Sequence, residues 1–490
     1  MDYISIQGTD VPAPKSEAGF LQSAGFEIGS FIMSFFTDYN SYGAMQDFGD
    51  YEGETVEVWL TTGRDQAQIM REMVDDFTDK ENIAVNYKLV ASGTLLPAVL
   101  AKIGPDVSTD ADATGFGVRS AVKNLAEKDE NGNYIYEGFD EVRGIGDYEG
   151  KGWFSEEAWT GLTVYNPDDA ERNPEAVYGV PVTQSFSMLF YRKDIFVELG
   201  LKVPETWDDV YDIIRVLSDN NMSMGLSQAM TQILMYQKGI PYYKGDGDIR
   251  AVGYASNLDS NEALDAFQQM CEYFKMYGQP VSYDFANRFR TGEMPIGIAD
   301  YSLCNQLLCF APEIKGLWEF VRLPGSYDAD GNFSAVSPTG ASAIMIMADA
   351  KNDQNAWKYI KWWVGAEAQE RFGKEQVAIM GSAAKYNTAN IEALYGQPWS
   401  SQEAKNLGDQ FASLKGTPMT PGNYILARYT NFAFLDVYDK GDAASEAMRY
   451  YMDEINKEIT RKRAEYDFPT KDELLADGII DENGNLTANN

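Results

Sequence analysis

The chain has 490 residues, 44% of them hydrophobic and 13% aromatic, which predicts two or three folded units with sizeable cores. Its 75 acidic and 40 basic residues give a formal net charge of −35, which would repel nucleic acid or an anionic membrane surface. The sequence contains no histidine, so catalytic triads and zinc sites that depend on histidine are excluded.

Residues 1–52 are expected to form an N-terminal extension with an amphipathic helix. "MDYISIQG" has the pattern of a strand end, and "TDVPAP" breaks it, so the segment could be the remnant of a preceding module. Between Gly19 and Phe36 apolar residues recur near helical spacing, although Glu27 and three glycines interrupt the run. This pattern favours a packing helix over a membrane anchor, and no signal-peptide pattern precedes it.

An alternating strand and helix pattern begins after the acidic linker "DFGDYEGE". "TVEVWL" predicts a strand, and the next helix places Ile69, Met73 and Phe77 on one face. "IAVNYKLV" predicts a second strand, and an apolar helical set follows from Leu95 to Ile103. This order is typical of an α/β layer with parallel strands. Ligands meet such sheets at the carboxyl ends of strands, where the loop "GPDVSTDADATG" is expected to lie.

A polar patch interrupts the apolar stretch "YGVPVTQSFSMLFYRKD" at Thr183, Gln184 and Ser185. Two buried strand segments that flank such a patch are what a hinge crossing between two lobes would need. Downstream, "VPETWDD" predicts a helix start with a capping box between Thr206 and Asp209. The second lobe is expected to begin there, with the buried helix face formed by Val210, Ile213, Ile214 and Leu217.

A series of segments resembles the landmarks of extracellular solute-binding proteins of ABC importers, in the sugar-binding branch of maltose-binding-like receptors. The segments are, in order, "VEVWLTTGRDQAQIMREMVDDFT", "GPDV", "YGVPVTQSFSMLFYRKDIFVELGLKVPETWDDVYDI", "FANRFRTGEMPIGIADY" and "AWKYIKWWVGAEAQERFG". The resemblance covers residues 54–463. It implies an α/β, two-lobed periplasmic-binding-protein-like fold (type II) whose lobes, joined by multiple crossings, close around a ligand.

The resemblance also implies where the chain crosses between lobes. The crossings are expected at Val182 to Ser187, near Val336 to Ala341, and around Tyr386 to Ile391. Lobe 1 would then comprise residues 53–182 and 342–388, and lobe 2 residues 187–336 and 391–463. Residues 464–490 are acidic and turn-rich, and this C-terminal tail is expected to lie on the surface.

The function that the resemblance implies is non-catalytic. The protein would bind a carbohydrate, in particular an oligosaccharide, and deliver it to the membrane permease of an ABC transporter, as a monomer without cofactor or metal. It would be extracellular and tethered to the outer face of the bacterial membrane. The family's lipoprotein cysteine behind a signal peptide is absent, so a longer natural chain is expected, and "MDYISIQG" is similar to the closing strand of a carbohydrate-binding jelly-roll module.

A pyranose presents apolar C–H faces and a ring of hydroxyls, so its site needs aromatic platforms and fixed polar groups. Thr62 and Arg64 lie at a helix start whose free N–H groups can donate to an oxygen, although Thr62 could merely cap that helix. Asp106 and Asp112 could accept hydroxyl hydrogen bonds or serve as turn residues. Their spacing misses the calcium-binding EF-hand pattern.

The other ligand-binding candidates lie at the crossings and in the second lobe. Each has a structural alternative: hinge geometry for the glycine, and core or helix packing for the tyrosines. The candidates are Gln184, Tyr236, Asp300, Tyr301, Thr339, Gly340, Tyr424 and Arg428. Trp357, Trp362 and Trp363 recur near helical spacing, which favours a core role for Trp357 and one of the other two.

A carbohydrate-active enzyme is the alternative function, because two carboxylates that flank a cleft would suffice for glycosidase chemistry without histidine. No carboxylate pair can be placed at the required separation from the sequence, so the receptor is favoured. The three cysteines, Cys271, Cys304 and Cys309, lie in no CxxC motif and cannot all pair. Each is expected to be a free, mostly buried thiol.

Overall fold

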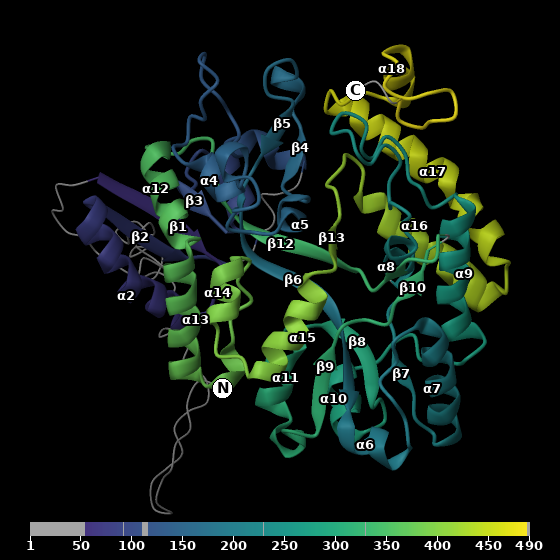
Figure 1. Ribbon diagram of the computed structural model, residues 1–490. Coiled ribbons are helices and arrows are strands. Elements are labelled where there is room, and N and C mark those ends of the chain that lie inside the picture. Colours follow the sequence, from purple (N-terminus) through teal and green to yellow (C-terminus); the bar gives the residue numbers. More distant parts are fainter. Residues whose placement is uncertain (1–53, 92, 110–115, 229, 329, 488–490) are drawn as a thin grey trace, which may run out of the picture.

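One sheet runs through both lobes of the computed structural model, which describes residues 54–91, 93–109, 116–228, 230–328 and 330–487 (Figure 1). The sheet has nine strands in the order β2-β1-β3-β12-β6-β8-β7, with β13 paired to β12 and β9 paired to β6. The strands are β1 (Glu54–Leu60), β2 (Ile83–Leu89), β3 (Val107–Ser108), β6 (Val180–Arg192), β7 (Met224–Gly225), β8 (Ile296–Asp300), β9 (Trp318–Val321), β12 (Ser337–Ile346) and β13 (Leu414–Gly416). The predicted N-terminal strand and helix lie outside the described residues.

Lobe 1 holds the parallel part of the sheet, because β1 pairs in parallel with both β2 and β3. The predicted α/β pattern is therefore confirmed. The helices of this lobe are α2 (Arg64–Glu81), α3 (Leu95–Leu100), α4 (Phe139–Arg143), α5 (Glu156–Trp159), α12 (Asp353–Trp363), α13 (Ala366–Met380) and α14 (Ile391–Gly396), and its hairpin is β4 (Thr163–Tyr165) with β5 (Glu175–Val177). Trp357 and Trp363 are both buried in the lobe 1 core, as predicted.

The second predicted helix of lobe 1 is shorter than its apolar pattern suggested. α3 ends at Leu100, and its buried residues are Leu95 and Ala98. Leu100 and Ile103 are 77% and 70% exposed. The helix therefore covers only part of the predicted apolar set, because such a short helix can turn only one narrow face toward the lobe.

Lobe 2 has separate cores of its own, which is why it is a distinct body. One core contains Trp207 and Phe267, and another contains Phe190 and Phe289. The helices are α6 (Lys193–Glu198), α7 (Trp207–Asp219), α8 (Met230–Gln237), α9 (Asn261–Lys275), α10 (Phe285–Thr291), α11 (Leu303–Phe310), α15 (Ser401–Phe411), α16 (Tyr424–Leu435), α17 (Ala444–Glu465) and α18 (Lys471–Ala476), and the hairpin is β10 (Ser326–Tyr327) with β11 (Phe333–Ser334).

The helix that was predicted to open lobe 2 forms as expected. Thr206 caps α7, its hydroxyl accepts from the Asp209 amide, and the Asp209 carboxylate accepts in return from the Thr206 amide at 2.9 Å. The pKa of Asp209 is lowered chiefly by that backbone hydrogen bond from Thr206. The predicted apolar residues of this helix are all buried. Local sequence therefore sets the start of this helix, and burial of one face holds it on the lobe.

Two long strands carry the chain between the lobes. β6 pairs with β12 up to Phe186 and with β8 from Ser187 onward. β12 pairs with β13 from Ser337 and with β3 at its end, at Met345 and Ile346. These changes of partner fall at or beside the first two expected crossings, because an extended strand can belong to two layers without breaking its hydrogen bonds.

The third crossing lies later than expected. Helix α14, which follows the predicted crossing at Tyr386 to Ile391, still packs on α13 of lobe 1, and the Ile391 amide donates to Trp153 O at 3.0 Å. Helix α15 packs on β9 of lobe 2, where Asn406 donates to Phe320 O at 2.8 Å. The chain therefore returns to lobe 2 between α14 and α15, a shift that the sequence hid because α14 has no pattern specific to either lobe.

The C-terminal segment lies mostly on the surface, as expected, but it is folded and anchored to the body. After α17 the chain forms α18 and a short bridge between Ile480 and Leu486. Phe468 is 4% exposed and Leu474 is fully buried. Apolar residues spaced among the acidic ones anchor this segment to the body.

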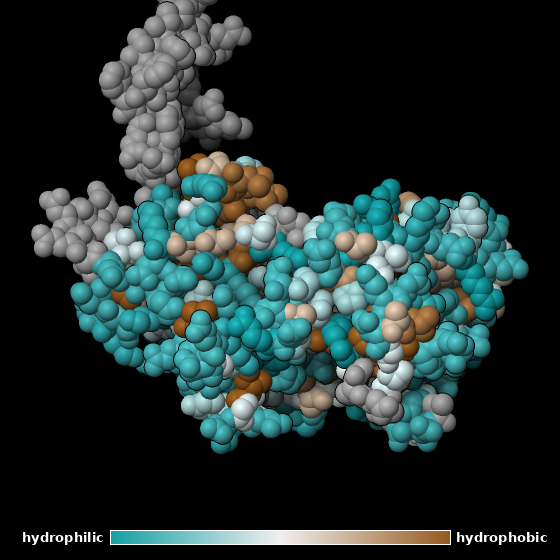
Figure 2. Space-filling view, turned by 90° about the horizontal axis from the view of Figure 1, so that it is seen from above, coloured by the Kyte–Doolittle hydropathy of each residue, from teal (hydrophilic) through white to brown (hydrophobic). Residues whose placement is uncertain are grey.

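Hydrophilic residues cover most of the face shown in Figure 2, and apolar residues appear there as separate patches. This is the surface that the excess of acidic residues predicts. Within the described residues, no helix is both long enough and apolar enough to cross a bilayer.

One of the three cysteines is expected to react with a thiol reagent in the native protein. Cys271 and Cys304 are buried, as predicted, and burial raises the pKa of each thiol to about 12. Cys309 is exposed, which corrects the expectation for that residue. Because the thiolate is the reactive form, titration with Ellman's reagent should find one fast thiol per native chain and all three after denaturation. Fast reaction of a second thiol in the native protein would contradict this assignment.

Candidate ligand-binding site

A cavity of about 420 Å³ lies between the two lobes, beside the β6–β12 crossing. Lobe 1 contributes the turn that follows α5, and the crossing strands contribute the floor. Lobe 2 contributes α8, the end of β8 and the segment that follows β13. The lining residues are Gly161, Leu162, Ser185, Phe186, Ser187, Gln232, Asp300, Pro338, Thr339, Gly340, Ala341, Thr417 and Met419.

The polar groups of the cavity are hydroxyls, one amide and one carboxylate. Gln232 of α8 donates to the Thr417 hydroxyl at 2.7 Å and to the Tyr236 hydroxyl at 3.2 Å, so its position is held by two partners. One oxygen of Asp300 accepts from the Ser302 amide at 2.9 Å. No lysine or arginine is among the described lining residues. The cavity can therefore bind a hydroxyl-rich neutral molecule better than an anion.

An aromatic pair forms the wall behind these polar groups. Phe186 lines the cavity and stacks on Tyr301, with ring centroids 4.5 Å apart and an interplanar angle of 25°. Leu162 and Met419 close the cavity from opposite lobes. Apolar surface beside fixed polar groups is the combination that a pyranose ring requires.

Of the residues predicted to bind ligand, Asp300, Thr339 and Gly340 line this cavity. A Cβ atom built on Gly340 would meet no atom within 4 Å, so this residue leaves open space. Thr339 has a structural duty as well, because its hydroxyl donates to Ser185 O at 2.8 Å across the two crossing strands.

Tyr301 and Gln184 are buried and have structural roles, and neither lines this cavity. Tyr301 is 1% exposed, and its hydroxyl donates to Gln184 O at 3.2 Å, so its ring supports Phe186 from behind. The Gln184 side chain is also 1% exposed and donates to Ser155 and Thr339 hydroxyls, each at 3.1 Å. The polar patch in β6 thus ties lobe 1 to the crossing strands, and Gln184 borders a separate cavity together with Thr183 and Asn305.

Asp106 also has a structural role. It is 5% exposed, and its two oxygens accept from the backbone amides of Glu57 at 2.8 Å and Lys351 at 2.7 Å. The carboxylate therefore joins β1 to the segment after β12, and backbone amides already engage both of its oxygens. Asp112 lies outside the described residues.

Thr62 and Arg64 lie at the start of α2, away from the residues that line the cavity. The Thr62 hydroxyl contacts the Gln66 side chain, and Gly63 is the N-cap residue of the helix. Thr62 therefore precedes the N-cap position and does not cap the helix itself. Arg64 is exposed.

The remaining candidates are in lobe 2. Tyr236 is 7% exposed and touches the site through Gln232. Tyr424 is 54% exposed and bonds to Glu458 through its hydroxyl, while the Arg428 guanidinium lies over the Phe432 ring at 5.7 Å. Neither Tyr424 nor Arg428 lines the cavity, because Tyr424 bonds to Glu458 of the neighbouring helix α17 and Arg428 lies along its own helix α16.

Sequence reasoning missed Gly161, Leu162, Gln232, Thr417 and Met419. Gln232 lies one helical turn before Tyr236, so the helical pattern could have pointed to it. The other four come from irregular segments with no motif, and only the fold brings them to the crossing.

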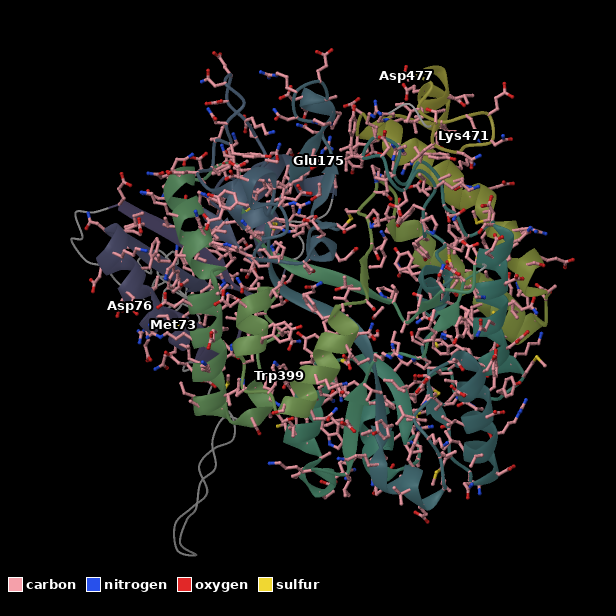
Figure 3. The ribbon with its side chains drawn as sticks, in the orientation of Figure 1. Met73, Asp76, Glu175, Trp399, Lys471 and Asp477 are labelled. Atoms are coloured by element: carbon pink, nitrogen blue, oxygen red, sulfur yellow. The ribbon has the colours of Figure 1, made fainter. Side chains whose placement is uncertain are left out.

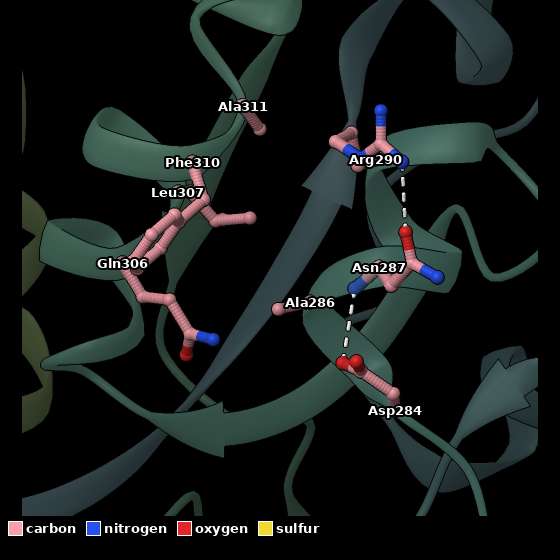
Figure 4. A pocket seen from close by; sticks show the side chains of 8 residues that line it. All are labelled: Asp284, Ala286, Asn287, Arg290, Gln306, Leu307, Phe310 and Ala311. Carbon is pink, nitrogen blue, oxygen red and sulfur yellow. Dashed lines mark hydrogen bonds between the residues drawn. The ribbon is translucent and has the colours of Figure 1, made fainter. Parts of the chain in front are cut away.

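Other cavities lie elsewhere. One of about 310 Å³ lies within lobe 2, between α10 and α11 (Figure 4). Its Arg290 is already occupied by the Asn287 side chain and Glu313, each at 2.9 Å. Closure of the two lobes cannot enclose a ligand there. Another cavity, of about 440 Å³, is bordered by Gln66 of lobe 1 and Asn305 of lobe 2 and includes Lys385. The cavity at Asp300 is the candidate site because it combines a carboxylate with an apolar wall and has no basic residue among its described lining residues.

Comparison with known proteins agrees with this architecture. A family model described as bacterial extracellular solute-binding protein matches residues 62–370. A protein of Brucella abortus (strain 2308) that is named as a binding protein is 23% identical over 312 residues, covering 61% of this chain and 68% of that protein.

Two solved structures have a similar fold. The sugar-binding protein MalE from Xanthomonas citri has a TM-score of 0.63 and 18% identity, covering 84% of this chain and 99% of that chain. The maltose-binding periplasmic protein MalE from Listeria monocytogenes, solved with maltose, has a TM-score of 0.59 and 15% identity, covering 84% of this chain and 99% of that chain. These matches confirm the expected two-lobed fold.

Proposed function

The chain belongs to the bacterial extracellular solute-binding proteins, and from this premise we propose that it is the receptor of an ABC importer for a neutral oligosaccharide. The protein would bind the sugar in the interlobe cavity and present the closed lobes to a membrane permease. The proposal includes a monomeric receptor that is tethered to the outer face of the bacterial membrane. The division into two lobes, with the third crossing between α14 and α15, is part of the same proposal.

The observation that supports this proposal most directly is the chemistry of the interlobe cavity. Hydroxyls, an amide and one carboxylate surround an apolar wall, and no basic residue is among the described lining residues. A sugar hydroxyl can donate to Asp300, and Gln232 can both donate and accept. The structural relatives named above are sugar-binding and maltose-binding proteins, which supports the same ligand class.

The enzyme alternative is not supported. The family and the structural relatives are binding proteins. Glycoside hydrolysis requires two carboxyl groups that flank the bond, and Asp300 is the one carboxylate among the described residues that line the cavity. Incubation with oligosaccharides should therefore release no new reducing ends.

A thermal-shift panel of maltose, maltotetraose, mannobiose, mannotriose and an acidic galacturonate oligomer tests the ligand class. We expect at least one neutral sugar to stabilise the protein, by about 2.7 kcal/mol at a hundredfold excess over its dissociation constant. The acidic oligomer should give no shift. Stabilisation by the acidic oligomer alone would overturn the proposal.

Asp300→Ala is expected to weaken binding of the stabilising sugar roughly 10- to 100-fold, since a hydrogen bond to a charged group is worth about 1.5–3 kcal/mol. Isothermal titration calorimetry measures the change. Asp284→Asn, in the lobe 2 cavity of Figure 4, is the matched control, because asparagine caps α10 as well as aspartate does. Equal affinity of both variants would remove Asp300 from the site.

A further inference from the structure

The two lobes also make a second contact, formed by segments other than the crossing strands. Residues 466–468 follow α17 of lobe 2 and pack against the β4–β5 hairpin of lobe 1. In Figure 3, Glu175 of β5 lies to one side of this contact, and Lys471 and Asp477 of the α18 region lie to the other. The lobes are therefore connected by a non-covalent contact in addition to the hinge.

An aromatic pair and one arginine make this contact. Tyr165 of β4 meets Phe468 edge-on, with ring centroids 5.5 Å apart and an interplanar angle of 75°. Arg119 of lobe 1 donates to Tyr466 O at 3.2 Å, and its guanidinium carbon lies 5.6 Å from the Phe468 ring centroid. Tyr165 and Phe468 are 8% and 4% exposed, so the contact excludes water.

Lobe 2 holds its side of the contact rigidly. Arg463 also lies over the same ring, 5.5 Å from its centroid. It also donates to Pro469 O at 2.7 Å, which fixes the residue that follows Phe468. Asp248 and Arg250 form an ion pair at 2.6 Å, and the charges of both residues act on Tyr165. The Phe468 ring is thus presented to lobe 1 in one orientation.

The ligand cavity lies between this contact and the hinge. Leu162 lines the cavity and directly precedes β4, and Met419 lines the cavity and packs against the Tyr165–Phe468 cluster. If the lobes opened at the hinge, Tyr165 and Phe468 would separate and expose apolar surface to water. The contact therefore opposes opening whether or not a ligand is present.

We propose that Arg119, Tyr165 and Phe468 form an interlobe latch that holds the ligand-free protein closed. Its effect on affinity rests on the proposed function: a receptor whose closed state is already populated binds more tightly than one that must first close. An aromatic pair and a cation–π contact each favour the closed state by roughly two- to tenfold. The latch residues position the lobes and need not touch the sugar.

The distance between the lobes in the absence of ligand tests the latch directly. Spin labels at Glu175→Cys and Lys471→Cys, in a Cys309→Ser background, report lobe separation by pulsed electron resonance. Both label sites and Cys309 are exposed, whereas the two other cysteines are buried. Without sugar, the parent protein should show one narrow distribution at short distance.

Arg119→Gln and Tyr165→Ala should each increase the long-distance population roughly two- to tenfold. Arg322→Gln is the matched control, since Arg322 also lies over an aromatic ring, at 5.2 Å from Phe333, but entirely within lobe 2. Melting curves identify any variant that fails to fold, in which case Arg119→Gln decides. A parent distribution that is already broad, or latch variants that match the control, would overturn the latch.

The affinity consequence is measured with maltose, maltotetraose and mannobiose on the same variants. The dissociation constant of whichever sugar binds should rise roughly two- to tenfold in Arg119→Gln and stay unchanged in Arg322→Gln. The distance measurement requires no sugar, so a latch without sugar binding would refute the proposed function alone. Sugar binding without a closed ligand-free state would refute the latch alone.

Discussion

Replacing Arg463 with methionine is expected to lower the free energy of unfolding by about 3 kcal/mol, because buried carbonyls that lose their donor cost about 1–3 kcal/mol each. The Arg463 guanidinium is fully buried and donates to Pro469 O, Val252 O and Arg250 O. Burial lowers the pKa of Arg463 to about 10, so the side chain stays charged at neutral pH. Methionine carries no charge, so the variant no longer pays the cost of burying one. The expected loss in the free energy of unfolding is therefore smaller than the sum for three lost hydrogen bonds.

Arg461→Met provides the comparison, two residues earlier in the same helix. Arg461 is exposed and pairs with Glu458 and Glu465 on the surface of α17, and such pairs are worth only about 0.3–0.5 kcal/mol each. Urea unfolding measures both variants. Amide exchange should also accelerate over residues 466–487 in Arg463→Met alone, because Pro469 loses its anchor. Equal stability losses in the two variants would show that the buried guanidinium is not the anchor.

Gly340→Phe is expected to reduce affinity for the sugar by roughly 100-fold or more, equivalent to about 2.7 kcal/mol. Gly340 lies on β12 at the floor of the cavity, and an added side chain enters space in which a Cβ meets no atom within 4 Å. The new ring would occupy volume that the ligand needs. Stability should change little, since extended backbone accepts an aromatic residue readily.

Gly340→Ala separates occlusion from backbone effects, because a single methyl group leaves most of the cavity of about 420 Å³ free. Calorimetric titration with the stabilising sugar should therefore give a graded loss from alanine to phenylalanine, with similar melting temperatures for both ligand-free variants. Full affinity in Gly340→Phe would place the sugar outside this cavity.

Gly340 and Arg463 lie on opposite sides of the cavity, so substitutions at the two positions should have different effects on the lobes. Gly340 lies at the hinge side of the cavity, and Arg463 supports Phe468 at the latch side. Loss of Arg463 should therefore also loosen the latch, whereas Gly340→Phe should leave lobe separation without ligand unchanged.

Much of the fold could be predicted because it depends on local patterns. The alternation in "TVEVWL", the capping box at Thr206 and Asp209, and the buried face of α7 are each set by neighbouring residues. Trp357 and Trp363 could be placed in the core for the same reason. The third crossing could not, because α14 is short and its packing partner, α13, is chosen only in the folded lobe.

The site was predicted less completely. Asp300, Thr339 and Gly340 could be found because the family resemblance places a crossing at Val336 to Ala341 and a cleft segment at "IADY". Asp106 and Tyr301 fit the same pattern, yet the structure buries both of them. Sequence can show that a polar residue lies at a strand end, but it cannot show whether backbone amides will occupy its oxygens.

The sequence by itself therefore determined the elements, the parallel sheet of lobe 1 and the family resemblance, because periodicity, capping and motif order act over short distances in the chain. Only the tertiary structure decided which side chains border the cavity and that Phe468 reaches Tyr165, residues that are about 300 positions apart. Such contacts depend on how two separately packed lobes meet, and no local pattern encodes that geometry.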